Sequence, residues 1–166
     1  MEYIKDWDEY FFRHVYLASW KSKDPRSKIG ATLVKDGVVI SEGYNGFGRG
    51  VLDLPERYED RETKYKFVVH AEANAILNCV RTGIATKNSI LYTQGKPCHE
   101  CSKLIIQAGV KEIVYHSIWP NLIHSQKWVE SIQIAEIMLR EANIDIRAFD
   151  KVLGIEGYLD NQIIKI

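Results

Sequence analysis

Two short segments of the sequence carry side chains that can hold a metal ion and move protons. They are His70-Ala71-Glu72 and Pro97-Cys98-His99-Glu100-Cys101. Imidazole nitrogen and thiolate sulfur are ligands that zinc prefers. His70, Cys98 and Cys101 would leave the fourth coordination position to water, which is the arrangement of a catalytic rather than a structural zinc site. The two segments therefore predict one catalytic zinc ion.

The sequence around these residues favours metal binding and supplies a base. Both segments are predicted to open helices, whose N-termini carry partial positive charge and stabilise a thiolate. Pro97 suits such a start because its missing N–H costs nothing there. Two thiolates offset the charge of the zinc ion, so the ion acidifies a bound water less than it would in an all-histidine site. A nearby base is therefore useful. Glu72 lies on the same first turn as His70, and we assign it as a proton shuttle rather than a ligand.

Other interpretations of these residues remain open. Cys-x-x-Cys alone also occurs in redox pairs and in structural zinc sites, although a fourth ligand for such a site is hard to find. His99 adjoins a ligand and is expected to face solvent or lie behind the ligands, because adjacent side chains rarely reach one metal. We expect Cys79 to be buried and inert, and we expect His14 and His116 to have structural packing roles.

Composition narrows the class of protein. The 166 residues fit one globular domain spanning 1–166, and 46% hydrophobic residues are enough for a core. The numbers of basic residues (Lys plus Arg) and acidic residues (Asp plus Glu) are equal, at 22 each. Proteins that bind a nucleic-acid backbone usually have a surplus of basic residues. Three cysteines form no closed disulfide set, which indicates a reducing, cytoplasmic setting. No apolar run approaches the roughly 20 residues of a membrane span, and the start lacks a signal-peptide pattern.

Hydrophobic periodicity and turn residues predict alternating helices and strands. An Asp36-Gly37 pair between two apolar runs is a strong hairpin signal. Residues 43–64 are expected to form a long functional loop, and the tail 150–166 a short turn plus an extended segment. Helices are expected at 7–22, 71–80, 98–107 (ended by Gly109) and 126–142, and strands at 31–35, 38–42, 89–93, 112–116 and 145–149.

The order of these elements predicts a three-layer α/β/α fold. The hairpin strands are antiparallel, whereas strands joined through a helix are expected to be parallel. The helix at 126–142 makes the last strand parallel as well. The expected result is a mixed five-stranded sheet with helices on both faces.

The His-Ala-Glu and Pro-Cys-x-x-Cys pair, in that order, resembles the cytidine and deoxycytidylate deaminase superfamily. The resemblance implies a cytidine-deaminase-like fold and one Zn²⁺ per chain. It also implies that zinc-bound hydroxide attacks C4 of cytosine while Glu72 shuttles protons. Within the superfamily the chain is most similar to the dCMP deaminases, which make dUMP for thymidylate supply. The segments that carry this likeness are 22–31, 43–46, 64–65, 74–76 and 104–109.

The likeness also implies substrate contacts and partners. Asn45 would bind the sugar hydroxyl, Arg26 with Lys23 or Lys28 would bind the 5′-phosphate, and Ala71 would contact the substrate. Family members are often homo-oligomers, mostly hexamers, activated by dCTP and inhibited by dTTP, with Mg²⁺ accompanying the dCTP. Neither a membrane nor a nucleic-acid partner is expected.

Two other functions are weighed against this one. A tRNA adenosine or single-strand cytosine deaminase predicts a basic groove, which the neutral charge disfavours. A non-catalytic zinc module predicts that replacing Glu72 changes nothing. Several side chains are weaker candidates for the site: Tyr44, Tyr115 and Trp119 for base stacking, and Arg49 and Arg57 for phosphate. The charged run 56–66 is expected to be a solvated lid or an oligomer edge.

Overall fold

The structure is a computed structural model of the chain, and it describes residues 3–119 and 126–166. At its centre lies a five-stranded sheet of order β2-β1-β5-β6-β7. β1 pairs antiparallel with β2 and β5, and β5, β6 and β7 run parallel, so the predicted mixed sheet is confirmed. Its strands are β1 (Gly30–Lys35), β2 (Val38–Tyr44), β5 (Ile90–Thr93), β6 (Glu112–His116) and β7 (Asp145–Phe149).

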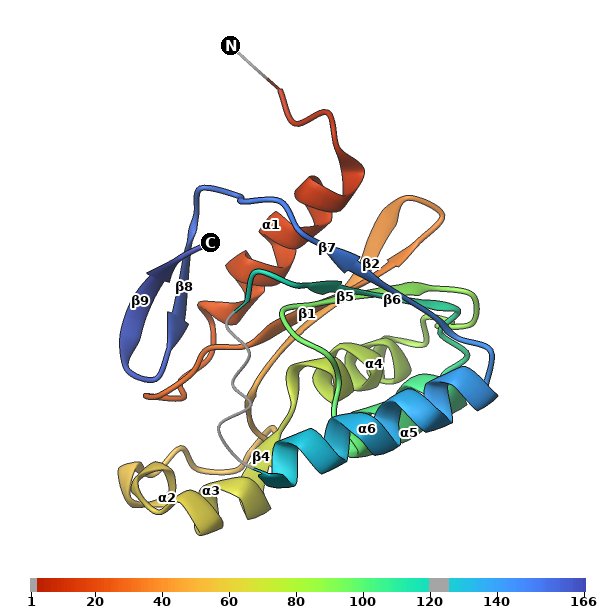
Figure 1. The fold of residues 1–166 in the computed structure, drawn as a ribbon. Helices are drawn as coiled ribbons and strands as arrows, with labels where there is room; N and C mark the ends of the chain where they lie inside the picture. Colours follow the sequence, from red (N-terminus) through yellow and green to blue (C-terminus); the bar gives the residue numbers. More distant parts are fainter. Residues whose placement is uncertain (1–2, 120–125) are drawn as a thin grey trace.

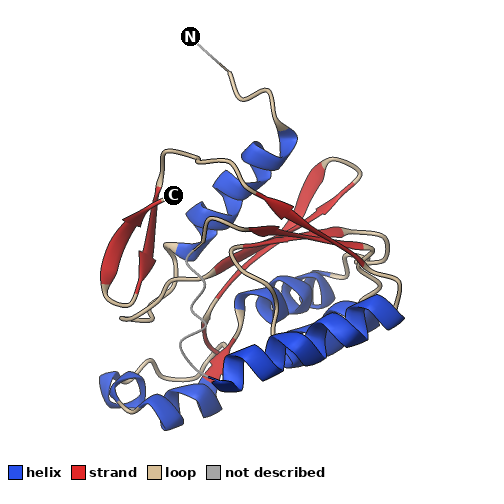
Figure 2. Ribbon diagram, in the orientation of Figure 1, coloured by secondary structure: helices blue, strands red, loops and turns tan. Residues whose placement is uncertain are grey.

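Helices cover both faces of this sheet, which confirms the three-layer prediction (Figure 1, Figure 2). One face carries α1 (Trp7–Ser19). The other carries α4 (Ala71–Thr82), α5 (His99–Gln107) and α6 (Gln126–Glu141). One buried cluster joins the sheet to α4, α5 and α6, and a second joins it to α1.

Residues with positive φ lie at the hairpin turn and at the helix end that the sequence predicted. Asp36 and Gly37 have φ of 51° and 76°, which is the two-residue turn that matches the twist of a hairpin. Gly109 has a φ of 70° just beyond α5.

The prediction of an uninterrupted loop at 43–64 is wrong. The segment contains β3 (Gly46–Phe47) and α2 (Pro55–Glu59), and it runs into α3 (Arg61–Phe67) and β4 (Val68–Val69). Pro55 occupies the first turn of α2, and the Asp60 side chain accepts a hydrogen bond from Thr63 N and caps α3. The charged run is only partly solvated, because Lys64 is buried and paired with Asp24.

The C-terminal tail forms a second hairpin rather than a single extended segment. Its strands are β8 (Glu156–Leu159) and β9 (Gln162–Lys165). Asp160 and Asn161 form the turn with φ of 47° and 64°, a conformation that these two residue types tolerate. The hairpin lies beside α1 (Figure 1). Within the described residues, none of the helices has the length and apolar character of a membrane span.

Candidate metal centre and active site

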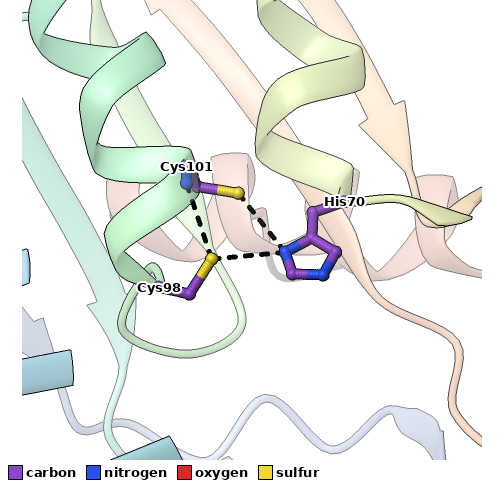
Figure 3. Close-up of side chains that lie close together, drawn as sticks. All are labelled: His70, Cys98 and Cys101. Carbon is purple, nitrogen blue, oxygen red and sulfur yellow. Dashed lines mark hydrogen bonds between the residues drawn. The ribbon is translucent and has the colours of Figure 1, made fainter. Parts of the chain in front are cut away.

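Two helix starts bring the candidate ligands together. His70 is the N-cap residue of α4 and Cys98 is the N-cap residue of α5. Gly43 on β2 lets α4 lie close to the sheet, because a Cβ there would stand 2.2 Å from Ala71 O and 2.3 Å from Ala75 N. The first turn of α4 is therefore held against the sheet, and it faces the first turn of α5 (Figure 3).

The three predicted ligands form one cluster. Nδ1 of His70 lies 3.4 Å from Sγ of Cys98 and 3.4 Å from Sγ of Cys101 (Figure 3). All three ligand atoms lie within 4.8 Å of one another. Tetrahedral zinc, with bonds of about 2.3 Å to sulfur and about 2.05 Å to nitrogen, places such atoms about 3.6 Å apart. The donor set and its spacing fit zinc and leave the fourth position to water.

Hydrogen bonding within the cluster shifts the pKa values of all three candidate ligands. Hydrogen bonding with Cys101 and with the neighbouring His70 lowers the pKa of Cys98 to about 4, against the effect of its burial. The hydrogen bond with Cys98 in turn raises the pKa of His70 to about 9, and the pKa of Cys101 is raised. Cys98 is therefore the ligand that loses its proton most readily, and metal binding would have to displace the protons of His70 and Cys101.

Glu72 lies next to the cluster without being one of its ligands. Its side chain is 7% exposed. Its Oε1 is 3.5 Å from Thr93 Oγ1, and its Oε2 accepts a hydrogen bond from Cys101 Sγ at 3.6 Å. Burial raises the pKa of Glu72. A carboxyl group with a raised pKa takes up a proton more readily than an ordinary carboxylate, which suits a proton shuttle.

A cavity of about 550 Å³ extends from this cluster to a group of cations. Its volume is in the usual range of small-molecule sites. His70, Glu72 and Cys98 line its metal end, and Arg26, Arg61 and Lys64 line the cavity as well. Aromatic walls come from Tyr115, Trp119 and Trp128. The cavity therefore combines a metal-binding end, flat apolar walls and positive charge.

The predicted substrate contacts fall into two groups. Arg26, Asn45 and Ala71 line the cavity. Lys23 lines a neighbouring groove instead, where its exposed ammonium pairs with Asp53 at 2.6 Å. Lys28 donates to the Ser22 carbonyl. Lys23 and Lys28, the two lysines proposed beside Arg26, thus both make contacts within the protein. The substrate-binding roles of all these residues stay predictions.

Asn45 has a structural task beside any substrate contact. Its Oδ1 accepts a hydrogen bond from Ile29 N at 2.8 Å, and its Nδ2 donates to Ser27 O at 2.9 Å. Nδ2 also approaches Asp24 Oδ2 at 3.3 Å. The amide thus ties the end of β2 to the segment that carries Arg26.

The weaker candidates divide as well. Tyr115 and Trp119 line the cavity, whereas Tyr44 is 40% exposed on β2. Arg49 donates to Asn78, and Arg57 donates to the Leu52 carbonyl.

His14 pairs with Glu42, and His116 is buried between Tyr16 and the Lys151 carbonyl. Cys79 is buried with a pKa raised by burial, and His99 bonds to Ser131.

Sequence reasoning missed several residues of the cavity. Asp24 is 1% exposed and accepts a hydrogen bond from Lys64 Nζ at 2.7 Å, so a buried ion pair joins the Arg26 segment to α3. Arg61, Thr93 and Lys96 also line the cavity. The likeness to the dCMP deaminases included Asp24, within segment 22–31, and Lys64-Tyr65, but it assigned no role to either member of the Asp24–Lys64 pair.

The family follows from a match over most of the chain. The model of the cytidine and deoxycytidylate deaminase zinc-binding region matches residues 5–117, which include all three candidate ligands and Glu72. The chain belongs to this family of zinc-binding deaminases.

Named relatives narrow the class further. The chain is 37% identical over 150 residues to deoxycytidylate deaminase of Mus musculus, covering 87% of this chain and 80% of that protein. It is 43% identical over 118 residues to the Homo sapiens deoxycytidylate deaminase, covering 68% of this chain but only 65% of the human protein's length. A solved dCMP deaminase from cyanophage S-TIM5, in complex with dCMP and dUMP, is 25% identical. It superposes with a TM-score of 0.65 over 89% of this chain and 100% of the phage chain.

Proposed function

We propose that this protein hydrolyses dCMP to dUMP and ammonia and so supplies dUMP for thymidylate synthesis. The observation that carries the proposal is the buried Glu72 carboxyl beside the His70–Cys98–Cys101 cluster, within a cavity that is also lined by Arg26 and Arg61. The deoxycytidylate deaminases among its relatives support dCMP as the substrate.

The residues of the cavity suit each step of such a deamination. Zn²⁺ held by His70, Cys98 and Cys101 would make a water molecule a better nucleophile near neutral pH. Glu72 takes a proton from the attacking water and gives it to N3 of cytosine. It then passes the second proton of that water to the departing amine, so that ammonia and a uracil ring result. Burial suits Glu72 for this because it disfavours the charged carboxylate.

The remaining cavity residues bind the rest of the nucleotide in this proposal. Arg26 contacts the 5′-phosphate, for which a guanidinium offers paired donors. Asn45 Oδ1 has a second lone pair and accepts a hydrogen bond from the sugar hydroxyl. Ala71 contacts the substrate from the first turn of α4. Lys23 and Lys28 add positive charge beside Arg26 rather than direct contacts. The whole chain, 1–166, acts as one domain.

A substrate panel tests this function and the role of Arg26. We expect the zinc-loaded protein to turn over dCMP better than CMP, deoxycytidine or a cytosine-containing oligonucleotide. Arg26→Ala should raise KM for dCMP about tenfold or more, since a charge-assisted hydrogen bond is lost, and leave deoxycytidine turnover as it was. Arg49→Ala, on the surface, is the control. Equal or better turnover of deoxycytidine by the wild type would remove the phosphate site, and preference for the oligonucleotide would favour a polynucleotide substrate.

We also propose that the protein is a cytoplasmic homo-oligomer, a hexamer, activated by dCTP with Mg²⁺ and inhibited by dTTP. The exposed apolar side chains Leu77, Val80 and Ile84, on α4 and just beyond it, support an interface, because such patches usually mark contact surfaces. Molar mass in solution tests the assembly. Superposable activity curves with and without dCTP and Mg²⁺ would end the regulatory proposal.

A further inference from the structure

The hairpin β8–β9 is part of the cavity although it lies outside the matched family region, residues 5–117. Its turn residue Asp160 lines the same cavity as Arg26 and His70. In Figure 1 the tip of the hairpin lies beside the segment that joins α1 to β1. That segment carries Arg26.

Polar contacts fasten the hairpin to the backbone on both sides of Arg26. Lys28 N donates to Tyr158 O at 3.0 Å, and Asn161 N donates to Arg26 O at 3.0 Å. The Tyr158 hydroxyl donates to the Pro25 carbonyl at 3.2 Å. The hairpin therefore contacts the backbone of Pro25, Arg26 and Lys28, and Asp160 N also donates to the Ser27 hydroxyl at 3.5 Å.

Arg26 is held from its other side by a buried carboxylate. Asp24 Oδ1 accepts hydrogen bonds from Arg26 N at 2.8 Å and from Ser27 N at 3.2 Å. The amide N–H of Arg26 is thus held by Asp24 and its carbonyl by Asn161. With both backbone polar groups held, the side chain projects toward the cavity from a fixed base.

The hairpin itself rests on the core and on a cavity wall. Leu159 and Ile166 are 5% and 1% exposed in the cluster below α1. Gly157 lies against Trp119, since a Cβ at Gly157 would stand 2.7 Å from Trp119 Cζ3. Trp119 lines the cavity. One C-terminal element therefore supports both the cationic segment and an aromatic wall.

We propose that the C-terminal hairpin is a positioning element for the anionic end of the substrate, acting through Asn161 on the backbone of Arg26 and through Tyr158 on the neighbouring backbone of Pro25 and Lys28. The inference rests on the proposed function, in which Arg26 contacts the phosphate. It predicts that the hairpin sets the affinity for phosphorylated nucleosides and not the rate of the chemical step.

Two hairpin variants and a matched control test this role. Tyr158→Phe removes only the hydroxyl that donates to Pro25 O. Asn161→Pro removes the N–H that donates to Arg26 O and the positive φ. We expect each to raise KM for dCMP by about two- to tenfold, as for the loss of one hydrogen bond, with kcat for dCMP and kcat/KM for deoxycytidine unchanged. Ile163→Thr, an exposed position of the same hairpin, should match the wild type.

Binding of dUMP and deoxyuridine by calorimetry separates this inference from the proposed function. If the wild type fails to deaminate dCMP but both variants weaken dUMP binding alone, the function is wrong and the positioning role stands. Unchanged KM and unchanged dUMP affinity in Tyr158→Phe overturn the positioning role and leave the function intact. Equal losses for nucleotide and nucleoside also overturn it, because they indicate only structural support. If Asn161→Pro does not fold, the result for Tyr158→Phe decides the question. Absence of dUMP binding by the wild type overturns both the positioning role and the proposed function.

Discussion

At the scale of single residues, the proposed function assigns metal binding and proton transfer to different side chains. His70, Cys98 and Cys101 approach one another closely enough to share one ion, while Glu72 stands beside them with its pKa raised by burial. A carboxylate that bound the metal would lose the freedom to carry protons. The separation of roles therefore depends on Glu72 remaining outside the ligand set.

Glu72→Gln should abolish turnover without releasing the metal. The amide is nearly the same size but cannot exchange a proton, and loss of a general acid–base group lowers kcat by about 10²–10⁴-fold. Steady-state kinetics on dCMP and zinc content by atomic spectroscopy measure the two effects. A variant that keeps full activity would show that Glu72 does not shuttle protons.

Cys98→Ser should lose zinc together with activity. A serine hydroxyl is a far weaker zinc ligand than a thiolate, and Cys98 is the thiol whose pKa is lowered to about 4. Cys79→Ala is the matched control, because Cys79 is equally buried but lies outside the metal cluster. Zinc content of both purified variants is the measurement. Retention of one zinc per chain by Cys98→Ser would contradict the assigned ligand set.

At the scale of elements, the site depends on how closely α4 approaches β2. His70 immediately precedes α4, so any shift of this helix moves His70 and Glu72 together. Gly43 permits the approach, since its missing Cβ would overlap backbone atoms of Ala71 and Ala75. These atoms belong to a helix and cannot turn aside as a flexible side chain can.

Gly43→Ala should therefore destabilise the protein and weaken the site. We expect a loss of about 1–3 kcal/mol in the free energy of unfolding, as for an overpacked core. The control is Gly46→Ala, where a Cβ would meet nothing within 4 Å. Denaturant unfolding and zinc affinity measure both variants. Equal stability of the two would show that α4 does not need the close approach.

At the scale of the whole molecule, ion pairs connect α1 to the far edge of the sheet. Arg147 on β7 donates to both carboxylate oxygens of Asp8 on α1, at 2.5 and 2.8 Å, and to Glu112 on β6 at 2.6 Å. Tyr92 donates to the same carboxylate at 2.7 Å. The first helix and the last strand of the central sheet are thus joined through one charged group.

This contact should make part of the stability depend on pH. Burial raises the pKa of Asp8, but the hydrogen bonds from Arg147 and Tyr92 outweigh it and leave the pKa below its ordinary value of 3.8. A lowered folded-state pKa means that the stabilisation is present above the unfolded pKa and is lost as pH falls through the folded value.

Asp8→Asn should thus be less stable than the wild type at about pH 7, by about 0.5–1 kcal/mol because Arg147 is partly exposed, and this difference should be smaller at about pH 3, where protonation of Asp8 begins to remove the stabilisation. Chemical unfolding at both pH values measures this difference. The two proteins differ only at Asp8, so the comparison isolates this side chain. A difference that is undiminished at about pH 3 would contradict the assignment.

Much of the fold and the metal centre could be predicted from local patterns. Periodicity, Asp36-Gly37 and Gly109 act over a few neighbouring residues, so they predicted the central strands and their directions. Zinc chemistry restricts its ligands to few residue types, so His70, Cys98, Cys101 and the nearby Glu72 were identified without coordinates. Short-range preferences and ligand chemistry are both properties of residue type.

The part of the cavity around Arg26 could not be predicted from local patterns, because it depends on tertiary structure. The ion pair of Asp24 with Lys64 and the hydrogen bond of Asn161 to Arg26 join positions far apart in the chain. Charge and turn propensity do not specify such partners, because every exposed lysine or Asp-Asn turn has the same local pattern. Only packing of α3 and the C-terminal hairpin against the Arg26 segment determined which of these residues are buried, paired and turned toward the cavity.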